Sequence, residues 1–224
     1  IVGLGPGSAD LITRRSWQLL QQTDVLYLRT SRHPAVADLP PGIRHVSFDP
    51  IYDEAEDFST VYARIAERLI AAAASGEDVV YGVPGDPGLG EATVSAVIDE
   101  AQRRNIAVTV LAGVSFLEPL LSALKQDALN GLQLFDGISV AGYNHPPVNP
   151  DFPLVLGQVY SRLLANDLKL SLMSVYPDDH QVTLVHGAGL TSQRLETMPL
   201  YEIDRSPHIG PLTSLYVPAL SQAS

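Results

Sequence analysis

The chain opens with IVGLGPGS, residues 1–8, in which a short apolar stretch runs into three glycines and a proline. Ile1 to Leu4 predict a β-strand, and Gly3, Gly5, Pro6 and Gly7 predict a tight loop at its end. A glycine-rich loop between a strand and a helix is typical of α/β proteins that bind ligands at the carboxyl ends of their strands. The remainder of the sequence must show what this loop does.

The loop does not have the spacing of a phosphate cradle. Counted from Gly3, the dinucleotide pattern requires glycine at the sixth position, where Ser8 stands, and no Lys follows as in a P-loop. Pro6 has no backbone N–H and so removes a donor that a phosphate would use. A tight turn that needs positive φ angles remains the structural alternative.

Two further loops share this character. VVYGVPGDPGLGEAT, residues 79–93, and LAGVSFLE, residues 111–118, each leave a predicted strand through glycine and enter a predicted helix. In a parallel sheet these loops lie at one edge, so we expect them to face a common crevice. Glycines let main-chain atoms approach a flat polar ligand closely, and an adenosine would suit such an edge.

The first half alternates short apolar runs with longer amphipathic ones, which predicts a mostly parallel sheet covered by helices. We expect strands at Ile1–Leu4, Val25–Leu28, His45–Phe48, Val79–Val83 and Val108–Leu111. One helix, capped by Asp10 or Thr13, runs to about Gln22, and a longer one begins at a Ser59 cap and ends at Gly76. A third helix ends near Arg104, and a fourth begins near Ser115.

After Leu124 the sequence pattern changes, because Pro, Asn and Gly interrupt the alternation of short apolar and longer amphipathic segments. We therefore predict an amino-terminal α/β domain over residues 1–125 and a smaller α/β domain over residues 126–224. In the second domain we expect an apolar strand at Leu154–Val159 and a helix over residues 161–176. Further strands are expected at Val182–His186, Leu195–Ile203 and Thr213–Val217.

The amino-acid composition limits the classes of ligand that the chain is expected to bind. With 224 residues, 46% of them hydrophobic, the chain can bury a full core. A net charge of −11 argues against nucleic acid, so a small molecule is the expected ligand. The absence of cysteine suits a cytoplasmic protein, and we predict no membrane span. The start without Met and the final SQAS suggest a chain that continues at both ends.

The three loops also carry a family resemblance. VGLGPGS, VPGDPGLGE and AGVSFLEP, in this order, resemble the tetrapyrrole methylases, and the similarity extends over essentially the whole chain. The resemblance implies two α/β domains with a ligand cleft between them and S-adenosylmethionine as the cofactor. It also implies that the first loop lines the cleft for cofactor and acceptor and does not cradle a phosphate.

Other segments of the sequence resemble one particular subgroup of this family. YLRTSRHPAV, SFDPIYDEAEDF, VTLVHGAG and LTSLYVP, with QVYSRLLANDLKLSLMSVYPDDH before the last two, are similar to the methylase-like amino-terminal half of MazG-type proteins. In such proteins a nucleotide pyrophosphohydrolase domain usually follows. The family also implies a homodimer.

The resemblance implies a set of cofactor contacts. In the first domain these are Pro6, Pro84, Gly85, Asp86, Leu89, Ser115 and Phe116, and in the second they are Gln158, Leu184, His186, Gly187, Leu212 and Thr213. Two positions depart from the family pattern: Gln158 replaces a common Met, and the bulky Phe116 replaces a small residue. Both departures weaken the case for ordinary porphyrinoid methylation.

Polar residues at the ends of the second and third strands are candidates for binding the methyl acceptor. They are Tyr27, Arg29, His33, Asp49 and Tyr52, and the alternative for each is an ordinary surface loop residue. Arg29 could hold an acceptor carboxylate through two hydrogen bonds. Methyl transfer is a direct displacement that needs alignment more than a protein nucleophile, so the identity of the catalytic residues stays open.

Several residues have a structural interpretation beside the functional one. We expect Asp86 to shape its own loop and Glu91 to favour the start of the next helix, while His186 suits a cleft or a hydrogen-bonded core position equally. Neighbouring side chains diverge, so YPDDH, residues 176–180, predicts a solvated turn and no metal site. DEAED, residues 53–57, lacks a partner motif for nucleotide hydrolysis and should open the long helix.

Three functions follow from these residues. The first is an S-adenosylmethionine-dependent methyltransferase with an unknown acceptor, and the second is a non-catalytic ligand-sensing or dimerisation domain attached to a MazG-type pyrophosphohydrolase. The third is nucleotide binding, which few basic residues near the loops would support. The fold does not by itself decide between catalysis and sensing.

Overall fold

The computed structural model describes residues 1–54 and 57–220, and it confirms an α/β chain with two separate sheets. Its contacts divide the chain into two compact units, Ile1–Glu118 and Pro119–Ser224, which we call unit 1 and unit 2. The domain boundary at residues 125 and 126 stays a prediction. Part of the acidic run 53–57 and the final SQAS lie outside the described residues.

Unit 1 contains a parallel sheet in the order β1-β4-β2-β3. The strands are β1 (Val2–Gly3), β2 (Val25–Leu28), β3 (Arg44–Ser47) and β4 (Val80–Val83). Because all four strands run in the same direction, the loops that follow them leave from one edge of the sheet. This carboxyl edge is where the candidate residues of unit 1 are found.

The predicted strand at Val108–Leu111 is wrong. Among the described residues of this segment only Leu111 bridges to Val2, and its N–H donates to the carbonyl oxygen of Ile1 at 2.9 Å. Val108 and Val110 are exposed. The apolar pattern misleads because the neighbouring β1 is two residues long and offers little backbone for a ladder.

The helices of this half of the chain are α1 (Arg14–Leu20), α2 (Asp49–Glu54), α3 (Phe58–Ala74), α4 (Ala92–Arg103) and α5 (Leu117–Leu124), with 3-10 turns η1 (Ala9–Leu11) and η2 (Pro34–Asp38). Thr13 caps α1, as predicted, because its hydroxyl accepts the Ser16 N–H. The cap of α3 is Asp57, whose carboxylate accepts the Thr60 N–H at 2.8 Å. The prediction of Ser59 as this cap is therefore wrong.

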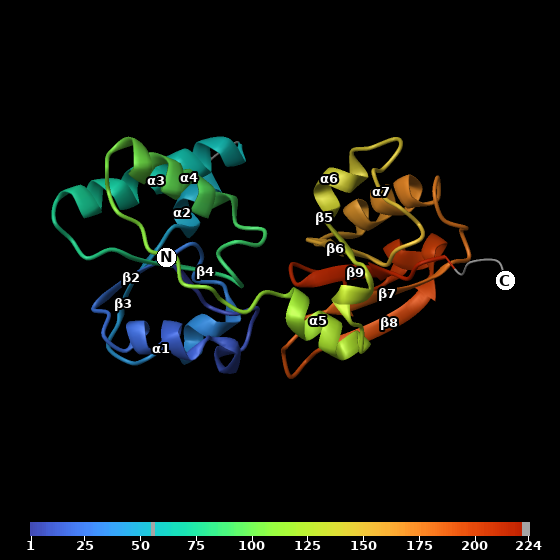
Figure 1. Ribbon diagram of the computed structural model, residues 1–224, viewed down its shortest axis with the longest axis horizontal. Coiled ribbons are helices and arrows are strands. Elements are labelled where there is room, and N and C mark those ends of the chain that lie inside the picture. The colour runs from blue at the N-terminus through green and yellow to red at the C-terminus, as the bar shows by residue number, and fades with distance from the viewer. Residues whose placement is uncertain (55–56, 221–224) are drawn as a thin grey trace. The chain divides into compact units, whose positions relative to one another are not determined.

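Alternation along the strands gives the unit 1 sheet a core on each face. Leu26 and Leu28 pack with Leu20 of α1, whereas Tyr27 and Tyr81 pack with residues of α3 and α4 on the opposite face. Figure 1 shows α1 on one side of the strands and α3 and α4 on the other. The sheet edge is thus supported by helices from both sides.

Unit 2 contains a mixed sheet in the order β5-β6-β9-β7-β8. The strands are β5 (Gln133–Asp136), β6 (Leu154–Gly157), β7 (Gln181–His186), β8 (Arg194–Pro199) and β9 (Thr213–Val217). β5 pairs parallel with β6, and the remaining pairs are antiparallel. The predicted strand at Leu195–Ile203 is too long, because η4 (Leu200–Arg205) begins directly after Pro199.

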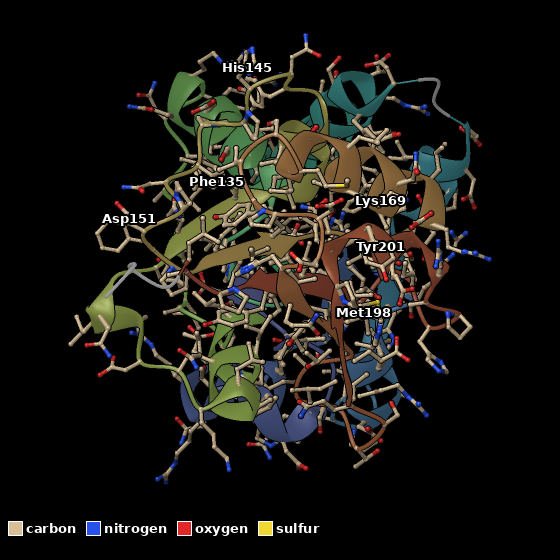
Figure 2. All side chains as sticks on the ribbon, turned by 90° about the vertical axis from the view of Figure 1, so that its right-hand side faces the viewer. Phe135, His145, Asp151, Lys169, Met198 and Tyr201 are labelled. Carbon is tan, nitrogen blue, oxygen red and sulfur yellow. The ribbon has the colours of Figure 1, made fainter. Side chains whose placement is uncertain are left out.

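The helix α7 (Arg162–Leu172), capped by Ser161, forms the core of unit 2 with the sheet. Leu168 and Leu172 are fully buried with Leu156 of β6. Lys169 of α7 forms an ion pair with Asp204 of η4 at 2.8 Å, on the side of the unit where Figure 2 labels Lys169 and Tyr201. β5, η3 (Ala128–Asn130) and α6 (Gly137–Ala141) lie in the stretch whose Pro, Asn and Gly content obscured any pattern.

Candidate functional site

Three glycine loops meet at the carboxyl edge of the unit 1 sheet, as the sequence predicted. The N–H of Gly85 donates to the carbonyl oxygen of Gly5 at 2.7 Å, which joins the first loop to the second. The carboxylate of Asp86 accepts the N–H of Gly88 at 2.7 Å and that of Gly113 at 2.6 Å. Asp86 therefore shapes its own loop and holds the third loop against it.

Gly3 and Gly113 are required for a steric reason that the sequence did not suggest. A Cβ added at Gly113 would lie 2.7 Å from the carbonyl oxygen of Gly85, and one added at Gly3 would clash with the same oxygen. These two glycines face neighbouring main chain, which requires glycine whether or not a ligand approaches their backbone, and the approach of a ligand stays a prediction. They let three loops cross in contact with one another.

The other residues predicted to contact a cofactor in unit 1 lie in or beside these loops. Pro6 is buried, whereas Pro84, Gly85, Leu89 and Phe116 are partly exposed. Ser115 is 1% exposed, and its hydroxyl donates to Glu118 at 2.7 Å and accepts the N–H of Leu117. Ser115 thus stabilises the start of α5.

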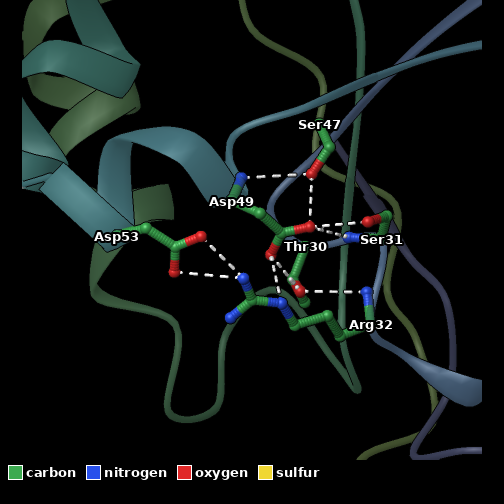
Figure 3. A network of polar contacts seen from close by, with 6 residues as sticks. All are labelled: Thr30, Ser31, Arg32, Ser47, Asp49 and Asp53. Carbon is green, nitrogen blue, oxygen red and sulfur yellow. Dashed lines mark hydrogen bonds and ion pairs between the residues drawn. The ribbon is translucent and has the colours of Figure 1, made fainter.

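Asp49 organises the loops after β2 and β3 (Figure 3). Its carboxylate accepts hydrogen bonds from the hydroxyls of Thr30, Ser31 and Ser47, each at 2.6 Å, and from the N–H of Ser31 at 2.8 Å. Although burial alone would raise the pKa of Asp49, these donors hold it well below its usual range. A carboxylate so fully hydrogen-bonded is a structural anchor.

Tyr27 also has an internal partner. It is 8% exposed, packs on Phe48, and donates its hydroxyl to Glu77 at 3.0 Å. Burial and the Glu77 carboxylate together raise the pKa of Tyr27. The polar atoms of Tyr27 and Asp49 are therefore already engaged by partners inside unit 1.

Arg29, Tyr52 and Glu91 form a polar group at the same edge, in which the Glu91 side chain is 6% exposed and the Arg29 side chain 29%. Nε of Arg29 lies 3.1 Å from a carboxylate oxygen of Glu91, and the guanidinium stands 5.4 Å from the centre of the Tyr52 ring. Burial raises the pKa of Glu91 to about 7, although Arg29 and the Thr93 hydroxyl lower it. The sequence analysis assigned Glu91 only to the start of α4, because nothing in one sequence pairs it with Arg29.

His33 completes this group. It is 6% exposed, and neither ring nitrogen has a hydrogen-bond partner among the described residues; the same holds for the Tyr52 hydroxyl. Burial, followed by the charge of Arg29, lowers the pKa of His33 to about 4, so the imidazole is neutral near pH 7. Buried polar atoms without partners are rare in folded proteins and mark sites that a ligand or water completes.

In unit 2 most of the predicted residues gather where β6 and β7 end and β9 begins. The N–H of Gly187 donates to the carbonyl oxygen of Leu212 at 2.8 Å, and Nδ1 of His186 lies 3.0 Å from the Thr213 hydroxyl. Gln158 has a φ of 62°, an uncommon value for a residue other than glycine. Leu184 is different, because it is fully buried in the core.

His186 lies in a hydrogen-bond network on the unit 2 sheet. Its Nε2 is 3.2 Å from the carboxylate of Glu196, which also contacts Nε2 of His208 at 3.5 Å and accepts the Ser206 hydroxyl. Burial lowers the pKa of His186, and the Glu196 carboxylate opposes this effect. The structure thus favours the hydrogen-bonded interpretation of His186.

Three further observations concern residues 1–54 and 57–220. No group of three or more His, Cys, Asp or Glu side chains is arranged there to hold a metal ion, and His180 instead contacts the Pro218 carbonyl oxygen at 2.9 Å. No helix of that part is long and apolar enough to cross a membrane. An open hollow of about 1140 Å³ lies in unit 1, lined by Asp24, Val79 and Thr109 among others, away from the glycine loops.

Comparison with known proteins gives consistent results. Residues 1–204 match the family model for tetrapyrrole (corrin/porphyrin) methylases. Over 223 residues the chain is 36% identical to the uncharacterized protein YabN of Bacillus subtilis (strain 168), covering 99% of this chain and 45% of YabN. It is 33% identical over 128 residues to precorrin-4 C(11)-methyltransferase of Mycobacterium tuberculosis, covering 56% of this chain and 47% of that protein.

Solved structures agree in fold. A cobalt precorrin-4 methyltransferase matches with a TM-score of 0.74 at 18% identity, over 99% of this chain and 95% of the other. Uroporphyrin-III C-methyl transferase from Thermus thermophilus, complexed with S-adenyl homocysteine, matches with a TM-score of 0.65 at 20% identity, over 97% and 90%. The chain spans about half the length of the curated relatives it matches.

Proposed function

Because the chain belongs to the tetrapyrrole (corrin/porphyrin) methylase family, we propose that it binds S-adenosylmethionine and transfers the methyl group to a small-molecule acceptor. The observation that carries the proposal is that three glycine loops are joined at the carboxyl edge of a parallel sheet, the first to the second by the Gly85–Gly5 backbone hydrogen bond and the second to the third by Asp86. Open α/β sheets bind their ligands at this edge. The related structure complexed with S-adenyl homocysteine has the same fold.

We assign the cofactor to the loop residues that the family resemblance indicates. In unit 1 these are Pro6, Pro84, Gly85, Asp86, Leu89, Ser115 and Phe116; in unit 2 they are Gln158, His186, Gly187, Leu212 and Thr213. Asp86 and Ser115 contribute by fixing the loops, because their side chains are engaged in internal hydrogen bonds. The partly exposed Leu89 and Phe116 would offer apolar surface to the ligand.

Bound S-adenosylmethionine supplies an electrophilic methyl carbon on a sulfonium. This methyl group would be transferred directly to the acceptor, so the loop residues assigned above would have to hold the cofactor with its methyl carbon facing the acceptor. The protein must hold donor and acceptor in line and exclude water, which accounts for several kcal/mol without any covalent intermediate. Rigid loops, crossing in direct contact, suit this task.

We place the acceptor at the polar part of the same edge, beside Arg29, His33 and Tyr52. These side chains lie in the exits of β2 and β3 or directly after them, and β2 is the neighbour of β4 in the sheet. Asp49 would support this site by holding the loops after β2 and β3, whereas Tyr27 bonds Glu77, which precedes β4 at the opposite edge of the sheet.

Calorimetry with S-adenosylhomocysteine tests the proposal. We expect saturable binding to the chain, competed by S-adenosylmethionine and not by ATP. The variant Gly113→Ala should reduce binding, since its Cβ would push the joined loops apart. An absence of heat with the folded wild-type protein at millimolar ligand would end the proposal, and competition by ATP would favour nucleotide binding.

A second candidate is a ligand-sensing or dimerisation domain. The chain covers 45% of YabN, so a further segment of that relative lies outside the match. A MazG-type domain there, a homodimer and a cytoplasmic location stay predictions. If S-adenosylhomocysteine binds but no acceptor in a metabolite panel is methylated, the sensing function is favoured.

A further inference from the structure

Arg29, His33 and Tyr52 present hydrogen-bond donors that the described structure does not fully use. The His33 ring nitrogens are buried without partners among the described residues, and the buried Tyr52 hydroxyl, near the donor Arg29, has no acceptor for its own hydrogen among them. The charge of Arg29 reaches His33, where it helps to lower the imidazole pKa. Leaving such groups unpaired costs about 1–3 kcal/mol each, so the site gains from a ligand that accepts their hydrogens.

Glu91 is the anion now closest to these donors, and it is poorly stabilised. Its ion pair with Arg29 joins Glu91 to Nε at 3.1 Å, and the Thr93 hydroxyl is 3.5 Å away. The Glu91 side chain is 6% exposed, so it has lost most of its hydration in exchange for these two contacts. A second carboxylate that also reached His33 and Tyr52 would be held by more donors.

We propose that Arg29, His33 and Tyr52 bind a carboxylate group of a ligand, and that Glu91 releases Arg29 and takes up one proton from solvent when that carboxylate arrives. The guanidinium donates to the incoming oxygens, the neutral imidazole donates one N–H, and the tyrosine donates its O–H. Protonation of Glu91 prevents two carboxylates from facing each other beside one cation.

The groups around Glu91 leave it as the one that titrates near neutral pH. Arg29 stays protonated, burial raises the pKa values of Tyr52 and Tyr81, and the pKa of His33 is about 4. Thr93 contributes a hydroxyl only. Glu91, with a pKa of about 7, can therefore exchange a proton when a ligand binds.

This inference rests on the proposed function for the identity of the ligand. Its carboxylate belongs either to the methyl acceptor or to the methionine end of the cofactor, and the site chemistry is the same for both. Acetate serves as the minimal probe of the site itself. S-adenosylhomocysteine and 5′-methylthioadenosine, which lacks the amino-acid carboxylate, distinguish the two sources.

The experiment follows the side-chain carboxyl carbon of Glu91 by NMR in protein labelled with ¹³C at glutamate Cδ. Glu91→Gln assigns the resonance, and triple-resonance spectra of the wild type assign it if that variant does not fold. We expect acetate, compared with chloride at matched ionic strength, to raise the midpoint of the Glu91 titration by roughly one pH unit. A midpoint that moves with neither acetate nor S-adenosylhomocysteine overturns the inference.

Variants separate recognition from general charge effects. Tyr52→Phe and His33→Phe should each weaken acetate, measured from the concentration dependence of the shift, by roughly fivefold. The matched control is Arg32→Gln, which removes a cation from the same loop at a side chain that is 65% exposed and should leave the acetate effect unchanged. Equal responses in Arg32→Gln and Tyr52→Phe would contradict the assigned site.

The outcomes also separate this inference from the proposed function. A shift with S-adenosylhomocysteine but not with 5′-methylthioadenosine assigns the carboxylate to the cofactor. A shift with acetate alone, while S-adenosylhomocysteine binds elsewhere, assigns it to the acceptor. If S-adenosylhomocysteine does not bind and acetate still shifts the midpoint, the methyltransferase proposal fails and the carboxylate site stands.

Discussion

The carboxylate of Asp86 and the N–H of Gly113 are 2.6 Å apart, although 27 residues of chain separate them. This bond attaches the loop after Leu111 to the loop after β4, while the other Asp86 oxygen accepts the Gly88 N–H. A single side chain thereby fixes two of the three glycine loops. Removal of the Asp86 carboxylate should therefore reduce both the stability of the chain and its binding of the ligand.

Asp86→Asn tests this role. An asparagine can accept at one oxygen, but its NH₂ group faces the other main-chain N–H, so we expect the free energy of unfolding to fall by about 2 kcal/mol. Urea denaturation measures the change. Asp99→Asn, at an exposed position in α4, should change stability by less than about 0.5 kcal/mol. Equal values for the two variants would show that Asp86 does not hold the loops.

Gly113→Ala should destabilise the chain for a steric reason. The added Cβ would lie 2.7 Å from the Gly85 carbonyl oxygen and 3.1 Å from the Asp86 Cα, so main chain must move. We expect a loss of about 2 kcal/mol or more and a lower melting temperature. Gly210→Ala is the control, because nothing lies within 4 Å of its added Cβ. A neutral Gly113→Ala would contradict the close crossing of the loops.

Asp49→Asn and Asp53→Asn compare a buried acceptor with an exposed one in the same network (Figure 3). Asp49 accepts four short hydrogen bonds, whereas Asp53 pairs with Arg32 through side chains that are 56% and 65% exposed. We expect Asp49→Asn to cost about 2–4 kcal/mol and Asp53→Asn less than about 1 kcal/mol. Denaturant unfolding at pH 7 decides the order, and a reversed order would refute it.

His33 should make stability depend on pH. Its pKa is lowered from 6.5 to about 4 in the folded chain, so between these values the unfolded chain binds a proton that the folded chain does not. The associated stability is complete above about pH 6.5 and is lost as the pH falls towards 4, by up to about 3 kcal/mol.

The variant His33→Phe isolates this effect. The difference in unfolding free energy between wild type and variant, measured in urea from pH 8 to pH 4.5, should change in the variant's favour as the pH falls. Because Glu91 titrates with the opposite sign, only this difference and not the wild-type curve tests the prediction. A constant difference would show that His33 keeps an ordinary pKa.

Gln158 offers a test in unit 2. Its φ of 62° favours glycine, so Gln158→Gly should relieve backbone strain by up to about 1 kcal/mol while it weakens S-adenosylhomocysteine binding if the side chain contacts the ligand. Asn105→Gly, at a φ of 56° after α4, should give a similar gain in stability and leave binding unchanged. Calorimetry on both variants makes the comparison.

The sequence predicted the regular elements where hydrophobic periodicity and caps agreed. β2, β4, α3, α4, α7 and β7 lie close to their expected positions, and the loops after β1 and β4 meet as the parallel order required. It failed where pairing decides the outcome. Residues 108–110 have a strand-like composition but no ladder, whereas β5 gains one by pairing with β6 in a stretch that looks irregular.

The candidate site divides in the same way. The glycine and proline pattern indicated the three loops, the resemblance indicated the cofactor contacts in them, and position after a strand indicated Arg29, His33 and Tyr52. The role of Glu91 was missed, because an acid after a glycine loop is typical of a helix start and its partner is 62 residues away along the chain. One sequence shows the type of each residue but not the distances that turn four of them into a group.

The crossing of the three loops at Gly3, Gly85 and Gly113 affects how the function of such proteins can change in evolution. A chain that had lost methyl transfer would still need Gly3 and Gly113, because an added Cβ would meet neighbouring backbone, and Gly85, because its φ is 65°. Mutations can consequently abolish methyl transfer while the three glycine loops are retained. Relatives that share the glycine loops can therefore differ in function. We expect such differences to lie in substitutions at the neighbouring polar positions, Arg29, His33 and Tyr52.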